Sequence, residues 1–322
     1  MDPAQFLTAS GVIIVAGKGG VGKTTVTAAL AVAASSVGLR TLVVEVEGKS
    51  GMASIFESGR LSYSELVLIR AAMGHAGVHA RTITPDDALL DYLSDRGLHR
   101  ISNRLVSSGV LDMVATAVPG IRDILVLGKV KQLERSGEFD LILLDAPAAG
   151  HAITFLRSAS GLVDAVKVGP INTQARDVLG LLTDPERCRV VLVTVPEETP
   201  VNELIETAYS LEDQVGVALG PVIVNGVYPE LAGLAADPGE AAEEAGVRLL
   251  GGEPELLRDA AGFRMVRTEL QRAQLQRMAD DLPLPQLHLP YLFTSDLGRA
   301  ELDALADSLL DRIRDLPDGT TE

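Results

Sequence analysis

The chain has 322 residues, 47% of them apolar, and a formal net charge of −16 at pH 7. This length suits one large α/β domain or two ordinary ones, and the acidic balance argues against nucleic-acid binding and against a polybasic membrane surface. Because no uncharged apolar run reaches the roughly 18 to 20 residues of a membrane span, and the N-terminus lacks the basic start of a signal peptide, we expect a cytoplasmic protein without membrane insertion.

The one cysteine, Cys188, excludes an internal disulfide. A buried thiol is the simplest interpretation, and two chains sharing an ion through it is the alternative.

Short β-branched runs alternate with helical stretches along the chain. The run at 12–15 predicts a buried strand, followed by an Ala-rich helix over about 23–37 that Gly38 ends in a left-handed conformation. Further apolar runs follow at 41–46, 141–144, 190–193 and 222–224, with a weaker run at 284–289, and 79–83 could add an edge strand. Since the runs are continuously apolar, we predict an α/β fold with a mostly parallel sheet covered by helices on both faces.

The segments between and after these strands show helical signals. We expect helical insertions on the carboxyl edge of the sheet at about 85–136 and 151–182, and a surface excursion at 229–254 followed by a long helix over 255–281. Near the C-terminus, leucines at helical spacing oppose a face of aspartates, which predicts a helix that packs on the protein. No internal repeat is found, so residues 1–322 are interpreted as a single decorated domain.

A glycine-rich loop follows the first strand and opens the first helix. Residues 17–24 fit G-x-x-x-x-G-K-[ST] in the strand–loop–helix context that this phosphate-binding motif requires, and a plain connecting turn is the alternative. Glycines let backbone N–H groups turn toward a phosphate, and the helix start adds partial positive charge. Lys23 is expected to reach the phosphate oxygens of ATP and the Thr24 hydroxyl to ligate Mg²⁺. The fold class is therefore that of a P-loop NTPase, with MgATP-binding candidates Gly17, Gly19, Gly20, Val21, Gly22, Lys23, Thr24 and Thr25.

Lys18 adds a second lysine early in this loop. The run Lys-Gly-Gly-Val-Gly-Lys-Thr resembles the deviant Walker A motif of dimeric ATPases that include the arsenite-pump ATPase, the tail-anchored-protein targeting ATPase, septum-site and partition ATPases, and nitrogenase iron protein. The resemblance implies that Lys18 is catalytic and reaches across a dimer to the partner's nucleotide, as a trans arginine finger does. A solvated loop charge is the alternative.

The segment at 44–50 resembles switch I of the arsenite-pump and tail-anchored-targeting branch. Glu47 stands where that branch usually has an aspartate, and the resemblance implies that it positions the attacking water. Its side chain is one methylene longer, and catalytic positioning tolerates little displacement, so we expect slow turnover. A solvated acid at the strand end is the alternative.

The segment at 144–151 resembles switch II of the same branch. Asp145 ends an apolar strand, where the family's acid holds Mg²⁺, commonly through water, and Gly150 could turn its N–H toward the γ-phosphate. Ala148 and Ala149 replace residues that the family usually keeps as proline and threonine. This departure leaves the metal role intact and affects the expected coupling of switch II.

Two more segments resemble the family's adenine site. Asn225 closes the strand at 222–224, where the family places an asparagine whose carboxamide can pair with the adenine edge. Asn225-Gly226 is also a good turn signal, which is the alternative. Pro290 and Phe293 belong to a stretch that resembles the loop packed against the base.

The biological role is less specified than the chemistry. With a single cysteine, the chain lacks the metalloid site of arsenite pumps and the Cys-x-x-Cys zinc pair of eukaryotic targeting ATPases, so it resembles a prokaryotic branch of the family. We expect a homodimer, or a heterodimer with a paralogue, in which ATP controls binding of an apolar protein client or another partner. A slow-hydrolysing nucleotide-dependent scaffold and a partition-type or septum-site-type positioning ATPase are the alternatives. The apolar residues of 85–136 are expected to pack on the sheet, with a client groove as the other possibility.

Overall fold

One nine-stranded sheet organises the protein. The computed structural model describes residues 1–46, 51–72, 74–95, 120–147, 149–294 and 296–317. The strand order is β3-β4-β2-β5-β1-β6-β8-β9, with β7 beside β6. The strands are β1 (Val12–Gly17), β2 (Thr41–Val46), β3 (Leu66–Ile69), β4 (Val78–Ile83), β5 (Leu141–Asp145), β6 (Cys188–Thr194), β7 (Ala218–Leu219), β8 (Val222–Val227) and β9 (Gln286–Pro290).

All strand pairs of this sheet are parallel except β3 with β4. The strand expected at 79–83 is therefore not an edge strand, because β3 pairs beyond it. β3 escapes prediction because it has only four residues and one of them, Val67, is 47% exposed. The mostly parallel sheet predicted from the continuous apolar runs is confirmed.

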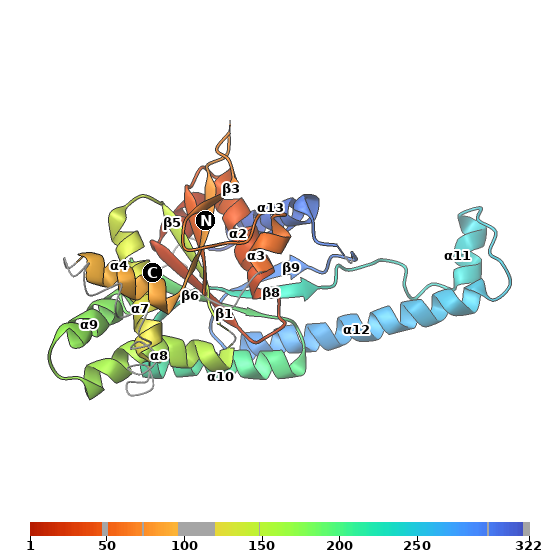
Figure 1. Ribbon diagram of the computed structural model, residues 1–322. Helices are drawn as coiled ribbons and strands as arrows, with labels where there is room; N and C mark the ends of the chain where they lie inside the picture. Colours follow the sequence, from red (N-terminus) through yellow and green to blue (C-terminus); the bar gives the residue numbers. More distant parts are fainter. Residues whose placement is uncertain (47–50, 73, 96–119, 148, 295, 318–322) are drawn as a thin grey trace.

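Helices cover both faces of the sheet (Figure 1). Successive β1 residues are buried on alternate faces, with Val12 and Ile14 in one apolar cluster and Ile13 and Val15 in the other. The first cluster is covered by α7 (Ile121–Ser136), α8 (Ala149–Ala165), α9 (Pro170–Leu182) and α10 (Glu198–Val215), with α4 (Pro85–Asp95) beside α7. The second is covered by α1 (Pro3–Thr8), α2 (Lys23–Ser36), α3 (Gly51–Ile55) and α13 (Arg299–Arg314). This two-sided burial explains why the strands read as continuously apolar.

The described parts of the two helical stretches belong to this covering layer. Ile124, Leu127 and Val130 of α7, and Phe155 and Leu156 of α8, are buried in the cluster beneath β1 and β5. These helices therefore cover a sheet face, where the sequence led us to expect additions at its carboxyl edge. The middle of the first stretch, residues 96–119, lies outside the described residues.

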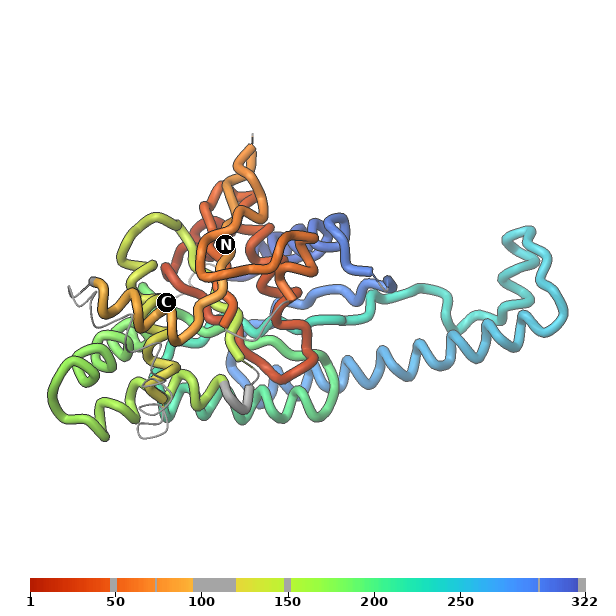
Figure 2. Tube along the Cα trace, viewed as in Figure 1, coloured from red at the N-terminus to blue at the C-terminus, as the bar shows by residue number. Residues whose placement is uncertain are grey.

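A long helix, α12 (Glu253–Asp281), extends well beyond the sheet and carries the short α11 (Pro238–Glu244) at its far end (Figures 1 and 2). We call residues 229–270 the arm. Its apolar side chains are largely exposed, whereas Met278, near the other end of α12, is 1% exposed and lies in the core. The predicted surface excursion and long helix are both present.

The C-terminal α13 packs as expected from its pattern. Leu302, Leu305, Leu309 and Ile313 are buried against α2 and the sheet. Within the part of the chain that the structure describes, no helix is long and apolar enough to cross a membrane. Cys188 is fully buried on β6, and burial raises the pKa of its thiol to about 12.

Candidate nucleotide site

The glycine-rich loop joins the carboxyl end of β1 to the first turn of α2. Its backbone needs glycine at two points. A Cβ on Gly17 would overlap the carbonyl of Val193 in the neighbouring strand β6, and a Cβ on Gly22, at φ +89°, would overlap the Asn225 carboxamide. Gly22 is followed by Lys23 and Thr24 as the first residues of α2, so free N–H groups of the helix start face the loop. The loop has the shape of a phosphate cradle.

Lys23 and Thr24 lie as a phosphate and metal site requires. Lys23 is 8% exposed, and its Nζ donates to the carbonyl oxygen of Lys18 at 2.8 Å, so the chain folds the ammonium back over the loop. The Thr24 hydroxyl donates to Oδ2 of Asp145 at 2.8 Å. Asp145 is fully buried at the end of β5, beside β1 in the sheet. Thr24 and Asp145 are 121 positions apart in the sequence, and the fold brings their side chains into contact.

The donor set of this pair fits a magnesium ion. A threonine hydroxyl and a carboxylate are the hard oxygen ligands that Mg²⁺ takes in nucleotide sites, with water and phosphate oxygens completing its octahedron. Within the described residues no group of three or more His, Cys, Asp or Glu side chains forms a separate metal site. An ion at Thr24 and Asp145 would therefore depend on ligands supplied by a nucleotide and water.

The Lys18 ammonium is bonded to a residue outside its own loop. Its Nζ forms an ion pair with Oε1 of Glu203, on α10, at 2.6 Å, and the two side chains are 33% and 41% exposed. A pair this exposed contributes about 0–1 kcal/mol and is easily exchanged. Sequence reasoning did not identify Glu203, because nothing in the pattern of α10 relates it to the loop.

The two switch segments are only partly described. Glu47 and Ala148 lie outside the described residues, while Gly150 falls in the first turn of α8, directly after β5. A buried acid that the sequence did not single out, Glu45, stands at the carboxyl end of β2, opposite Asp145 in the strand register. Its Oε1 accepts a hydrogen bond from the backbone N–H of Met52 at 3.0 Å. A charged residue inside a continuous apolar run is the signal that identifies it.

A hollow of about 310 Å³ extends from the loop toward the ends of β8 and β9. Thr25, Asn225 and Pro290 line it, and Asn225 Nδ2 donates to the carbonyl of Val21 at 3.0 Å. The volume lies at the lower end of small-molecule sites. The predicted nucleoside residues thus converge here, with one difference: Phe293 lies behind the hollow, in an aromatic cluster with Tyr228 and Tyr291.

The other wall of this hollow comes from α12. Gln271 is buried, accepts from the backbone N–H of Tyr228 at 2.8 Å and donates to the carbonyl of Gly226 at 3.1 Å. Arg267 also lines the hollow and bonds Glu197 at 3.1 Å, an interaction that raises the pKa of the guanidinium. Arg267 and Gln271 lie more than 40 positions after Asn225 in the sequence, so only the tertiary fold reveals that they line the same hollow.

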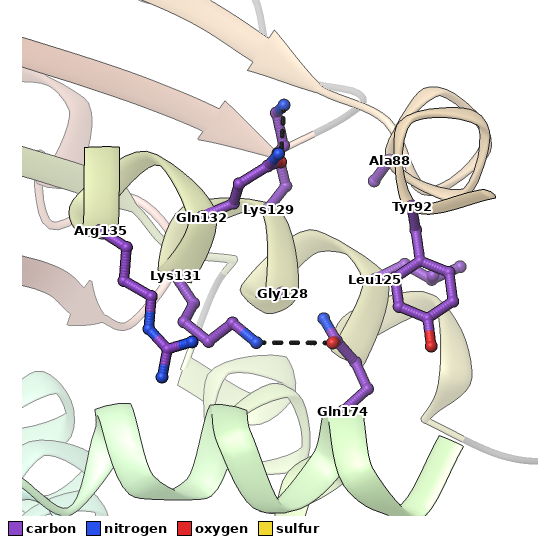
Figure 3. A pocket seen from close by; sticks show the side chains of 9 residues that line it. All are labelled: Ala88, Tyr92, Leu125, Gly128, Lys129, Lys131, Gln132, Arg135 and Gln174. Carbon is purple, nitrogen blue, oxygen red and sulfur yellow. Dashed lines mark hydrogen bonds between the residues drawn. The ribbon is translucent and has the colours of Figure 1, made fainter. Parts of the chain in front are cut away.

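A second hollow, of about 250 Å³, lies between α4, α7 and α9 (Figure 3). Lys129 and Lys131 make it look cationic, but Lys129 bonds Asp91 at 2.6 Å and Lys131 bonds Asp177 at 2.9 Å. Their charges are therefore largely balanced within the chain. Arg135 also lines this hollow, but within the described residues its lining includes no glycine-rich loop or helix start of the kind that forms the phosphate cradle.

A strand, a glycine loop, a helix opening with Lys-Thr and a strand-end aspartate bonded to that threonine define a P-loop nucleoside triphosphatase. Residues 10–174 match the family of anion-transporting ATPases. Along most of its length the chain is similar to ATPase BagA of Mycobacterium tuberculosis, at 33% identity over 92% of this chain and 91% of that protein. It is also similar to an arsenical pump-driving ATPase of Acidiphilium multivorum, at 27% identity over 85% of this chain and 50% of the relative, and to ATPase get3 of Schizosaccharomyces japonicus, at 29% over 54% of each. The chain belongs to the anion-transporting ATPase family and is an ATP-binding ATPase.

Proposed function

We propose that this protein is a MgATP-operated switch whose active site is completed by a second chain. The observation that carries the proposal is the contact between Thr24 and Asp145, at 2.8 Å, beside the buried ammonium of Lys23. Thr24 and Asp145 would hold Mg²⁺, the latter directly or through water, and the ion would screen the phosphate charge. Lys23 would exchange its bond to the Lys18 carbonyl for phosphate oxygens.

The proposed role of Lys18 is to act on the nucleotide of the partner chain. Its ammonium is bonded to Glu203, on α10 and outside the phosphate loop, so reaching another chain requires breaking only a partly exposed ion pair. Glu47 would position the attacking water and Gly150 would contact the γ-phosphate. Asn225 and Pro290 would hold the adenine, and Phe293 would support that site from the aromatic cluster behind it. ATP would close a homodimer or a heterodimer with a paralogue, and hydrolysis would reopen it and release a bound partner or apolar segment.

The metal part of this proposal is tested with Thr24→Ala. Phosphate release is measured with Mg²⁺ and with EDTA, and ATP affinity is measured separately by calorimetry. Since residues that merely support metal ligands cost 10- to 100-fold when removed, we expect the rate to fall at least about tenfold. Thr173→Ala, which removes an exposed hydroxyl on α9, is the matched control. An unchanged rate in Thr24→Ala, or a rate insensitive to EDTA, would contradict the proposal.

A further inference from the structure

The arm exposes an unusual amount of apolar surface. Side chains exposed between 48% and 70% follow one another along it: Leu231, Val247, Leu250, Leu256, Leu257, Phe263, Val266 and Leu270. Isolated exposed leucines are ordinary on proteins, but contiguous apolar surface marks an interaction site. Most of this region extends away from the sheet and its covering helices (Figures 1 and 2), and only its base touches them, where Arg267 pairs with Glu197 at the start of α10.

A hollow of about 700 Å³ lies within this surface, between α11, α12 and the chain that links β8 to α11. Its walls include Leu234, Val247 and Leu257, and several alanines that leave the backbone accessible: Ala241, Ala245 and Ala261. Small residues allow a helix to approach closely, and flanking leucines provide apolar contact. This lining of leucines and alanines suits the apolar face of an amphipathic helix.

The charge around the hollow selects among possible occupants. Across the arm, residues 229–270, there are nine acidic side chains, Glu230, Asp237, Glu240, Glu243, Glu244, Glu253, Glu255, Asp259 and Glu269, and four basic ones, Arg248, Arg258, Arg264 and Arg267. Arg258 is already bonded to Asp237 at 2.8 Å. A second copy of the arm would bring acidic side chains together, and this repulsion disfavours association. A partner with basic side chains would instead be attracted.

We propose that the arm hollow is a docking site for an amphipathic helix of a partner protein, with an apolar face flanked by Lys and Arg. Contacts of Arg264 connect this hollow to the nucleotide region. The Arg264 guanidinium lies 4.1 Å from the Tyr228 ring and 4.9 Å from the Phe293 ring; Tyr228 lines the hollow near Asn225, and Phe293 lines the arm hollow. Control of docking by ATP rests on the proposed function, whereas docking itself does not.

The test uses the full chain without nucleotide and two fluorescent synthetic helices of about 18 residues, roughly 27 Å long. Both carry the same Leu/Ala face, flanked by Lys and Arg in one and by Glu in the other. From fluorescence anisotropy we expect the basic helix to bind at least about tenfold more tightly than the acidic one. Equal binding of the two helices, or no binding of either, overturns the proposal.

Two sets of variants place the site. The triple change E240K/E243K/E244K on α11 should weaken the basic helix about tenfold and strengthen the acidic one, while E206K/E212K/D213K on α10, with the same change in net charge, should have much less effect. Leu257→Gln should weaken binding, and Val168→Gln, at a site 82% exposed elsewhere, should not. An equal loss in the α10 triple variant overturns the location. The proposed occupant is overturned if the nucleotide-free chain forms a dimer that Leu257→Gln dissociates, because a second copy of the chain would then occupy the arm hollow.

Failure of the docking site and failure of the ATP site are distinguishable. Thr24→Ala should bind the basic helix with wild-type affinity in the absence of nucleotide, because neither Thr24 nor any other residue of the phosphate loop lines the arm hollow. Loss of helix binding in Thr24→Ala would overturn the independence of the arm site. Retained helix binding together with unchanged ATP hydrolysis would refute the proposed function alone.

Discussion

Gly22 and Gly20 of the phosphate loop offer a paired test of how the loop is held. Both have left-handed backbones, at φ +89° and +88°. A Cβ on Gly20 would meet nothing within 4 Å, whereas a Cβ on Gly22 would overlap the Asn225 carboxamide. Gly20→Ala therefore measures backbone strain alone, and Gly22→Ala measures the same strain plus the displacement of Asn225.

The expected difference follows from the contacts. A left-handed alanine costs roughly 1–2 kcal/mol. Moving Asn225 also breaks its bond to the Val21 carbonyl at 3.0 Å, worth about 1 kcal/mol, and distorts its rotamer by about 1 kcal/mol. Gly22→Ala should thus lower the free energy of unfolding by about 3–4 kcal/mol. Gly20→Ala should lower it by only the roughly 1–2 kcal/mol of the left-handed backbone.

The assay is urea unfolding by circular dichroism without nucleotide, so that stability is separated from ATP binding. Asn225→Ala completes a double-mutant cycle, since it removes the overlap. In that background Gly22→Ala should cost no more than Gly20→Ala does in the wild type. Equal destabilisation by the two glycine variants, or strict additivity with Asn225→Ala, would refute the geometry.

Three further predictions concern other parts of the chain. Glu203→Gln should release Lys18 and increase ATP-dependent association about two- to fivefold in sedimentation experiments; unchanged association would mean that the ion pair does not restrain the lysine. The Cys188 thiol, with a pKa of about 12, should not react with Ellman's reagent at about pH 8 until the protein unfolds, and fast labelling of the native chain would contradict its burial. The hydrogen bond from Lys131 lowers the pKa of Asp177. The ion pair therefore stabilises the folded protein at pH values above the unfolded-state pKa of Asp177, about 3.9, and this stabilisation is lost as the pH falls through the lower folded-state pKa. Because the aspartate is 40% exposed, Asp177→Asn should lower the free energy of unfolding by less than about 1 kcal/mol at pH 7, measured by urea unfolding, and should have no effect in strong acid.

Much of the fold was predictable because its signals are local. The runs that became β1, β2, β5, β6 and β8 are continuously apolar since both faces of the sheet are covered. The glycine loop, Lys23 and Thr24 were identified by motif spacing between a predicted strand and a predicted helix, and Asp145 by the resemblance of its segment to switch II together with its place at a strand end. The family assignment based on Lys18 and its neighbours is confirmed by the match of residues 10–174.

What escaped prediction depends on contacts between distant segments. The partner of Lys18 is Glu203, 185 positions away, and the wall of the nucleoside hollow is supplied by Gln271 on the arm helix. β3 is too short and exposed to have a pattern, so β4 was expected at the edge. Phe293 could be placed near the base by resemblance, but only the fold shows that it packs behind Tyr291 and toward the arm.

The central claim is that two chains share each ATP site through Lys18, and mixing two inactive variants tests it most directly. Lys18→Ala keeps its own phosphate cradle, whereas Lys23→Ala lacks the cradle lysine but keeps a Lys18 to donate. If Lys18 acts across the dimer, a mixture should recover about a quarter of the wild-type ATP turnover per chain, because about half of the dimers are mixed and each holds one complete site. If Lys18 acts only on its own nucleotide, the mixture will be as inactive as its components.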